Sequence, residues 1–278
     1  MFYVIAAVFA VGASLFVAET EAKTICTIVA DASHISDAGI TAPILQQGNC
    51  TERFTPASTF KVALSLMGFD AGFLKDEHAP SIPFREGYTY WGNPAWRQPT
   101  DPAAWMKYSV VWYSQQITHG IGAASMQKYV DAFRYGNRDF SGDAGKNNAL
   151  DRAWISSSLK ISPQEQAQFL AKIVNRKLPV DAHAIDMTTS IMKLGPLPEG
   201  SDDGWQIYGK TGAAAPQRAD GSYDKAHFYG WFIGWVNKGG RTRVFVRLIQ
   251  EEKEEKISAG IRNRDAFLKE LPSLLDKN

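Results

Sequence analysis

The spacing of hydrophobic positions along the chain divides it into strand-like ends and a helical middle. Near the N-terminus, two strand-like runs at 24–30 and 41–47 are separated by a turn-rich loop. Helical patterns then follow one another at 56–67, 103–118, 123–133, 164–175 and 183–193. Strand-like runs return at 205–212, 228–236 and 242–249, and a last helical pattern covers 258–271. This order predicts an α+β fold, in which N- and C-terminal segments form one antiparallel sheet and the helices form an inserted lobe.

The first residues predict an export signal. About 17 apolar residues precede a polar exit at Glu19, and the small residue Ala22 lies where a signal peptidase could cut. Residues 1–22 are therefore predicted to be a signal peptide and residues 23–278 the mature domain, located in the periplasm without a stable membrane partner. No Lys or Arg precedes the apolar run, which leaves open an uncleaved anchor or a true start upstream.

The overall charge bears on the class of partner. The 278 residues include 30 Lys and Arg and 29 Asp and Glu, a formal net charge of +1, and 45% are hydrophobic. A chain of this length and composition can bury the core of one large domain or two intermingled ones. The balanced charge gives no reason to expect a nucleic acid as a partner.

The only two cysteines of the sequence, Cys26 and Cys50, flank the two N-terminal strand-like runs. If these runs pair as a hairpin, the two thiols can face each other. An exported chain with two such cysteines favours a disulfide. Two free thiols in the core are the alternative.

A serine and a lysine three residues apart form the first candidate reactive pair. The pattern occurs five times, at Ser58/Lys61, Ser125/Lys128, Ser157/Lys160, Ser190/Lys193 and Ser222/Lys225. Spacing alone therefore selects none of them. Ser58 and Lys61 differ in setting because they open a buried helix, where unsatisfied backbone N–H groups and the helix dipole favour developing negative charge. Apolar surroundings would also shift Lys61 toward the neutral amine, which can act as a base.

A second motif, Lys210-Thr211-Gly212, occurs once and is predicted at the end of a C-terminal strand. A glycine on an edge strand lets the amide backbone of a substrate approach closely. Lys210 offers a fixed cation for a carboxylate, and Thr211 offers a hydroxyl. A turn lysine ahead of a glycine is the alternative for this motif in isolation.

Together, Ser-x-x-Lys on a helix and Lys-Thr-Gly on a strand resemble the signature of penicillin-recognising serine enzymes. Penicillin-binding proteins and class A β-lactamases carry Ser-x-Asn between them, whereas this sequence has Ser109-Val110-Val111. That Ser-x-Val, with Tyr135-Gly136-Asn137 and the run Trp154–Leu159, resembles the class D (OXA-type) β-lactamases. The resemblance extends from about Cys26 to the last helix. It implies the fold of serine β-lactamases and penicillin-binding transpeptidases.

The resemblance also implies a role for each matching residue. Ser58 resembles the nucleophile that becomes acylated. Lys61 resembles the lysine that reacts with carbon dioxide to give a carbamate, the general base of acylation and deacylation. Ser109 resembles a proton relay toward the leaving nitrogen. Trp154 resembles the indole donor that holds the carbamate, although a core tryptophan is otherwise the default.

Substrate-binding groups follow from the same resemblance. Backbone N–H groups of Ser58 and Ala213 would form the oxyanion hole. The other expected substrate contacts are Lys210, Thr211, Gly212, Val111, Arg262 and, at the rim of the pocket, Trp96. Arg262 matches the arginine that binds the β-lactam carboxylate, and Arg264 is its competitor. No metal is expected, and no cofactor other than carbon dioxide or bicarbonate.

The expected activity is hydrolysis of β-lactam antibiotics through a serine acyl-enzyme, which confers resistance. A transpeptidase is the nearest alternative, and Val111 and the lack of an extra domain count against it. A β-lactam sensor that is acylated and then stops is the other alternative. Sensors of that kind are fused to several membrane helices, whereas this sequence has one N-terminal apolar segment. A homodimer is left open.

Overall fold

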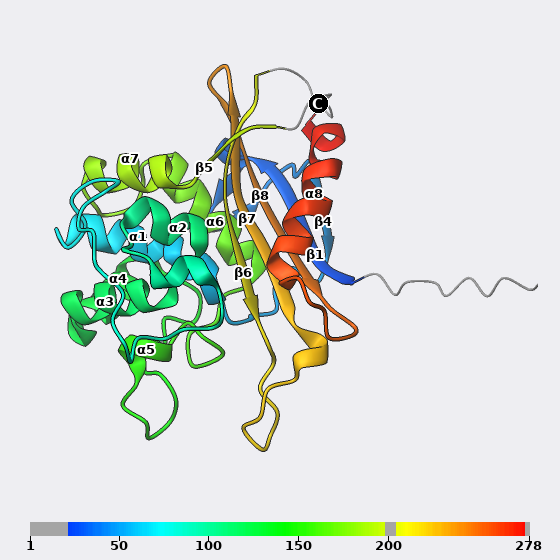
Figure 1. Ribbon diagram of the computed structural model, residues 1–278. Coiled ribbons are helices and arrows are strands. Elements are labelled where there is room, and N and C mark those ends of the chain that lie inside the picture. The colour runs from blue at the N-terminus through cyan, green and yellow to red at the C-terminus, as the bar shows by residue number, and fades with distance from the viewer. Residues whose placement is uncertain (1–21, 198–203, 276–278) are drawn as a thin grey trace, which may run out of the picture.

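The computed structural model describes residues 22–197 and 204–275, and its centre is a six-stranded antiparallel sheet (Figure 1). The strands are β1 (Lys23–Asp31), β4 (Leu45–Gly48), β5 (Lys193–Pro196), β6 (Gln206–Ala214), β7 (Tyr229–Lys238) and β8 (Arg241–Gln250). Their order is β4-β1-β8-β7-β6-β5, so N-terminal β1 pairs with C-terminal β8. The short strands β2 (Ile35–Ser36) and β3 (Gly39–Ile40) form a separate pair.

Helices cover both faces of this sheet (Figure 1). The helical lobe on one side contains α1 (Phe60–Asp70), α2 (Pro102–Tyr108), α3 (Val111–Ile121), α4 (Ala123–Phe133), α5 (Ala149–Arg152), α6 (Pro163–Val174) and α7 (Ala182–Ile191). On the other side, α8 (Ala259–Leu275) packs against β6, β7 and β8. The predicted α+β fold, with one sheet built from both ends of the chain and an inserted helical lobe, is confirmed.

The two buried faces explain why the C-terminal strands are nearly continuous apolar runs. Alternate residues of β7 point to opposite faces of the sheet. Trp231 and Ile233 belong to the core shared with the helical lobe, whereas Phe232 packs on Phe245 and Phe267 beneath α8. Side chains pack on both faces of the sheet, and this packing holds β6, the strand that carries the Lys-Thr-Gly motif.

Several predicted boundaries are wrong, and two of them affect the site. The helix predicted at 103–118 is two helices, because Ser109 has a left-handed backbone (φ 57°) that ends α2. The Lys-Thr-Gly motif does not end its strand but lies inside β6, which continues to Ala214. The helix expected to reach Lys193 ends at Ile191, and Lys193–Pro196 forms β5.

Cys26 and Cys50 form a disulfide, as predicted. The N-terminal hairpin brings them together, because β1 pairs with β4 and places Cys26 opposite Gly48. The bond ties β1 to the segment that follows β4. The predicted signal peptide lies outside the described residues, apart from Ala22. No helix among the described residues is long and apolar enough to cross a membrane.

Replacing Cys26 and Cys50 by alanine is expected to lower the free energy of unfolding by about 3 kcal/mol, because the disulfide restricts the unfolded chain. The two cysteines are 24 positions apart, and the bond closes the loop between them. Denaturant unfolding of the parent and of the double variant measures the difference. The parent with reductant should unfold like the double variant. Equal unfolding midpoints for oxidised parent and double variant would show that the disulfide adds no stability.

Candidate active site

A short turn before α1 holds Ser58. Ala57–Thr59 forms a 3-10 turn that leads into α1, and Ser58 is the partly exposed residue of that turn. The amide of Ala57 donates to the carbonyl of Trp154 (3.0 Å), and the hydroxyl of Thr59 donates to the carbonyl of Pro56 (2.7 Å). The next ten residues, 60–69, are all buried. The turn is thus anchored on both sides of an accessible serine.

Lys61, one turn after Ser58, is buried without a partner. Its exposed fraction is 0%, and its Nζ has no hydrogen-bond partner among the described residues. Burial lowers the pKa of Lys61 well below its usual value, and the charge of Lys210 lowers it further. Burial therefore favours the neutral amine of Lys61, which is both a nucleophile and a base.

The break between α2 and α3 places Ser109 and Val111 inside the protein. The hydroxyl of Ser109 is buried and has no hydrogen-bond partner within the part of the chain that the structure describes. Val111, the first residue of α3, is 1% exposed, and it offers an apolar side chain where an asparagine would offer an amide. α3, which begins at this break, packs against α1, the helix that carries Lys61.

Two tryptophans hold the break in place. Nε1 of Trp96 donates to the carbonyl of Tyr108 (2.9 Å), directly before Ser109, and Nε1 of Trp112 donates to the carbonyl of Trp96 (2.8 Å). Trp96 is only 6% exposed, so it supports Ser109 from inside. Trp91 packs on Trp96, with 5.6 Å between ring centroids, and is 59% exposed. The exposed aromatic surface at this position therefore comes from Trp91.

Trp154 lies in the core between two phenylalanine rings. It stacks on Phe60 with 5.6 Å between centroids and on Phe140 with 6.3 Å. Its side chain is 1% exposed. Phe60 directly precedes Lys61, so the indole lies beside the first turn of α1.

The outer edge of β6 is open beyond its contact with β5. Strand β5 pairs with β6 only as far as Tyr208, and the amide of Gly209 donates to the carbonyl of Met192 (3.0 Å). Residues two apart on a strand point their N–H and C=O groups to the same edge, so Ala213 faces outward like Gly209. No strand among the described residues pairs with this edge beyond Tyr208. The N–H of Ala213 is therefore directed toward the space outside the sheet.

Gly212 lets β6 lie directly against the turn that holds Ser58. A Cβ at Gly212 would lie 3.0 Å from the carbonyl oxygen of Pro56 and 3.1 Å from the amide nitrogen of Thr59. A side chain at this position would force the strand and the turn apart by a few tenths of an ångström, so glycine allows their closest approach. The contact brings the neighbouring Ala213 and Ser58 into one region.

Lys210, Thr211 and Arg264 line a cavity of about 500 Å³ beside this edge. Burial and, to a smaller extent, the charge of Arg264 together lower the pKa of Lys210 to about 7. The Nζ of Lys210 donates to the carbonyl of Thr211 (3.1 Å). These cationic and hydroxyl groups can hold an anion, with Arg264 as the permanent charge.

Arg262 is engaged by carboxylates away from this cavity. Its guanidinium forms ion pairs with Glu251 (3.3 Å) and Glu255 (2.7 Å). Glu251 is only 3% exposed, and burial raises its pKa while Arg262 opposes the rise. Arg262 therefore neutralises a buried carboxylate, and Arg264 is the arginine that faces the cavity.

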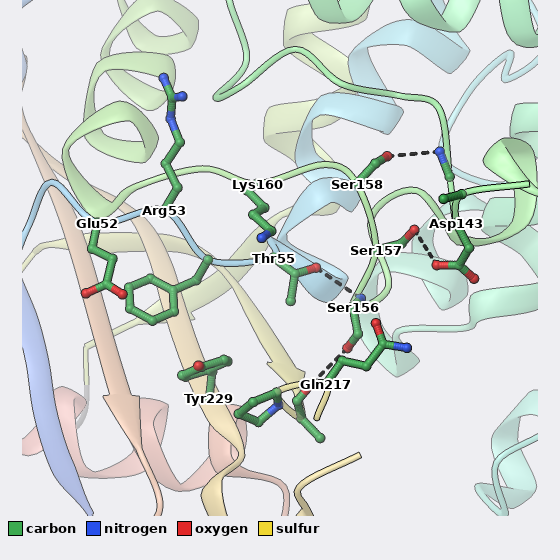
Figure 2. Close-up of a pocket in the computed structure, with 15 residues that line it drawn as sticks. Glu52, Arg53, Thr55, Asp143, Ser156, Ser157, Ser158, Lys160, Gln217 and Tyr229 are labelled. Atoms are coloured by element: carbon green, nitrogen blue, oxygen red, sulfur yellow. Dashed lines mark hydrogen bonds between the residues drawn. The ribbon is translucent and has the colours of Figure 1, made fainter. Parts of the chain in front are cut away.

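A group of hydrogen bonds joins the segment of Trp154 to two other chain segments, and Figure 2 shows the bond between Thr55 and Ser156. The hydroxyl of Thr55 donates to the carbonyl of Trp154 (2.9 Å) and accepts from the amide of Ser156 (3.1 Å). The hydroxyl of Ser156 donates to the carbonyl of Ala215 (3.1 Å), directly after β6. Thr55, Ser156 and Ala215 line a second cavity, of about 510 Å³. They form the wall between that cavity and the region of Trp154.

The same architecture occurs in known proteins. The family model for "Penicillin binding protein transpeptidase domain" matches residues 14–272. β-Lactamase OXA-9 of Klebsiella pneumoniae is 40% identical over 265 residues, 93% of this chain and 91% of that protein. β-Lactamase OXA-1 of Escherichia coli is 40% identical over 229 residues, 81% of this chain and 78% of that protein. The crystal structure of the class D β-lactamase OXA-427 matches with a TM-score of 0.81 at 46% identity, covering 91% of this chain and 98% of that one. The chain belongs to the class D β-lactamases.

In this class D β-lactamase, some of the site residues expected from the sequence lie together and others lie apart from them. Ser58 and Lys61 lie at the start of α1, Trp154 packs beside them, and Gly212 touches the same turn. The structure places two other expected substrate contacts elsewhere: Trp96 is buried support, and Arg262 is paired with Glu251 and Glu255.

The sequence did not point to Thr55 and Ser156 in this class D chain. Their only signal is a hydroxyl residue directly before Pro56 and a serine soon after Trp154, and such signals are too common to select a site. The contacts that give both residues a role are made between segments far apart in the chain. Among the described residues, no group of three or more His, Cys, Asp or Glu side chains is placed to hold a metal ion.

Proposed function

We propose that this chain hydrolyses β-lactam antibiotics through an acyl-enzyme on Ser58 and thereby confers resistance to them. The relatives OXA-9 and OXA-1 are named β-lactamases, which supports β-lactams as the substrate class. The observation that carries the proposal is the state of Lys61, one turn from the accessible Ser58. The amine of Lys61 is buried and has no hydrogen-bond partner among the described residues. A lysine in this state is suited to remove a proton from a nearby hydroxyl.

The substrate would be bound at two separate groups of residues. Its carboxylate would be held by Arg264, Thr211 and Lys210, which line one cavity. We assign Arg264 rather than Arg262 to this contact, because Arg264 lines the cavity, whereas Arg262 pairs with Glu251 and Glu255 away from it. Arg264 also pairs with Asp265 (2.8 Å), but that carboxylate is exposed to solvent, whereas Glu251 is buried. The β-lactam carbonyl oxygen would accept hydrogen bonds from the backbone N–H groups of Ser58 and Ala213, which stabilise the oxyanion that forms on attack.

The surroundings of Lys61 fit a carbamate. The amine is fully buried with a lowered pKa, and Val111 offers no polar group that would hold an ammonium ion instead. An unprotonated amine adds to carbon dioxide, and the resulting carboxylate would supply a general base for both half-reactions. The indole N–H of Trp154 would hold that group in place.

The chain's own residues would then carry the two half-reactions. Ser58 gives up its proton toward the Lys61 side chain while Oγ attacks the carbonyl carbon, and the ring C–N bond breaks. Ser109, with its buried and unpartnered hydroxyl in the described part of the chain, would relay that proton from the Lys61 side chain to the leaving nitrogen, so that the base is free again. A water molecule then gives a proton to the Lys61 side chain and attacks the ester carbon. The ester C–O bond breaks, and the proton passes from the Lys61 side chain to Oγ of Ser58, which restores the serine. The N–H groups of Ser58 and Ala213 would stabilise the oxyanion in both steps.

Turnover of a chromogenic cephalosporin such as nitrocefin tests the activity. We expect the purified protein to hydrolyse many equivalents per enzyme molecule. A release of colour that stops at one equivalent would contradict hydrolysis and would favour a sensor that is acylated and then stops.

The export of the enzyme remains part of the proposal. Residues 1–22 are predicted to direct it to the periplasm, and the Cys26–Cys50 disulfide supports an oxidising compartment. β-Lactam antibiotics act on the cell envelope, so hydrolysis in the periplasm would intercept them. Activity recovered in the periplasmic fraction of an expressing cell tests this location.

Replacing Arg264 by alanine is expected to raise KM for penicillin and lower kcat/KM by about tenfold to a hundredfold, because a charge-assisted contact to the carboxylate is lost. Replacing Arg262 by alanine should instead lower stability, because buried Glu251 loses its partner. Steady-state kinetics and thermal unfolding of both variants separate the two roles. A larger loss of kcat/KM in the Arg262 variant, at unchanged stability, would return the carboxylate contact to Arg262.

A further inference from the structure

We propose that Thr55 is a positioning residue, which holds Trp154 in the place required for deacylation. The inference rests on the proposed function, because it gives Thr55 a role in the reaction that Lys61 and Trp154 carry. Thr55 does not touch the reacting atoms. It acts through the backbone of the segment that contains Trp154.

The hydroxyl of Thr55 both donates and accepts a hydrogen bond. The side chain is buried, with 8% exposed, and its Oγ1 donates to the carbonyl of Trp154 while it accepts from the amide of Ser156. The carbonyl of Thr55 accepts from Nε1 of Trp231 on β7 (3.0 Å), so the residue is itself fixed to the sheet. A hydroxyl can donate and accept at once, whereas a valine of the same shape can do neither.

The segment around Trp154 depends on such an anchor. Helix α5 has ended at Arg152, and Ser156 has a left-handed backbone with φ 50°, which is unfavourable for a residue other than glycine. The hydrogen bond from the amide of Ser156 to Thr55 opposes relaxation of this conformation. Loss of the bond would let the segment move, and the indole would move with it.

Stacking alone does not fix the indole in all directions. Phe60 and Phe140 lie on the faces of the ring and so restrict its plane. The position of the ring along that plane is set by its backbone, whose carbonyl receives hydrogen bonds from Thr55 and from the amide of Ala57. Thr55 thereby ties the indole to the segment that leads into Ser58.

The cavity behind Thr55 makes these hydrogen bonds more important. Thr55 and Ser156 are among the residues that line a cavity of about 510 Å³ (Figure 2). A wall that borders an open cavity lacks the close packing that holds side chains in a core. The hydrogen bonds of the Thr55 hydroxyl therefore add to the packing on the other side of this wall, and their loss should let the Trp154 segment shift.

The test compares three variants by pre-steady-state and steady-state kinetics. Thr55→Val removes the hydroxyl and keeps the shape, Thr55→Ser keeps the hydroxyl, and Ser157→Ala is the control. Ser157 lines the same cavity, but its hydroxyl bonds to Asp143 (2.6 Å). We expect Thr55→Val to show a burst of acyl-enzyme and deacylation slower by about tenfold to a hundredfold. It should also need more bicarbonate for half-maximal rate, while Thr55→Ser and Ser157→Ala behave like the parent.

The bicarbonate requirement separates positioning from a loss of stability, which would leave it unchanged in the folded protein. A Thr55→Val variant without burst and with the bicarbonate requirement of the parent would overturn the inference. Equal losses in Thr55→Ser and Thr55→Val would also overturn it, because the hydroxyl would then be irrelevant. Failure of the proposed function itself would look different, since the parent would then not hydrolyse nitrocefin beyond one equivalent.

Discussion

Replacing Ser58 by alanine is expected to lower β-lactam turnover by a factor on the order of 10⁴ or more, because the chain loses the atom that forms the acyl-enzyme. The variant should still fold, since Ser58 is the partly exposed residue of its turn and alanine suits a helix start. Mass spectrometry after incubation with penicillin should find an acyl adduct on the parent and none on the variant.

Ser125 provides the matched control for this experiment. It has the same spacing to a lysine, Lys128, but it lies exposed on α4. Ser125→Ala should therefore turn over substrate like the parent and should still be acylated. An acyl adduct on the Ser58→Ala protein would contradict the assignment and would place the nucleophile at another serine.

The sheet could be predicted because its signals are local and strong. β7 and β8 are apolar runs, and the turn predicted at Asn237-Lys238-Gly239-Gly240 lies at Gly239-Gly240, with the two strands paired over their full length. β5 could not be predicted in the same way. Its residues Lys193–Pro196 include a glycine and a proline, which are poor strand formers, and the strand exists because β6 offers it a partner.

The break between α2 and α3 also could not be predicted from the sequence. The apolar spacing across Ser109 continues in a helical pattern, and a serine carries no local signal for a left-handed backbone. Trp96 stabilises the break through the carbonyl of Tyr108, and Trp96 is 12 residues away in the chain. Tertiary contacts therefore override the helical pattern at this point.

In the candidate site, too, some residues could be predicted from the sequence and others could not. Ser58, Lys61 and Lys210 stand in short motifs, and their expected roles follow from the family resemblance that these motifs carry together, since spacing alone fits five Ser/Lys pairs. The choice between Arg262 and Arg264 depends on which side of α8 meets Glu251, and that is decided by how the loop after β8 folds back onto the helix. A motif locates the segment, but only packing selects the arginine.

Replacing Trp154 by alanine is expected to slow deacylation by about a hundredfold or more, and to slow acylation less. A base is needed twice, once for the proton of Ser58 and once for the proton of the deacylating water. An ordinary lysine would be protonated after the first step and poorly suited to the second. Without the indole to hold the carbamate, the variant should accumulate acyl-enzyme, seen as a burst of product before a slow steady rate.

Added bicarbonate should restore part of the lost rate in Trp154→Ala, because it raises the share of Lys61 that carries the carbamate.

The pH dependence of deacylation also follows from Lys61. Burial lowers the pKa of Lys61, so its amine is unprotonated above that pKa and can add to carbon dioxide. As the pH falls through that pKa the amine becomes protonated, the carbamate is lost, and the rate of deacylation should fall on the acid side. Steady-state rates across pH, with and without bicarbonate, measure both effects. A Trp154→Ala variant that turns over like the parent, without a burst and without a response to bicarbonate, would show that Lys61 works here without a carbamate.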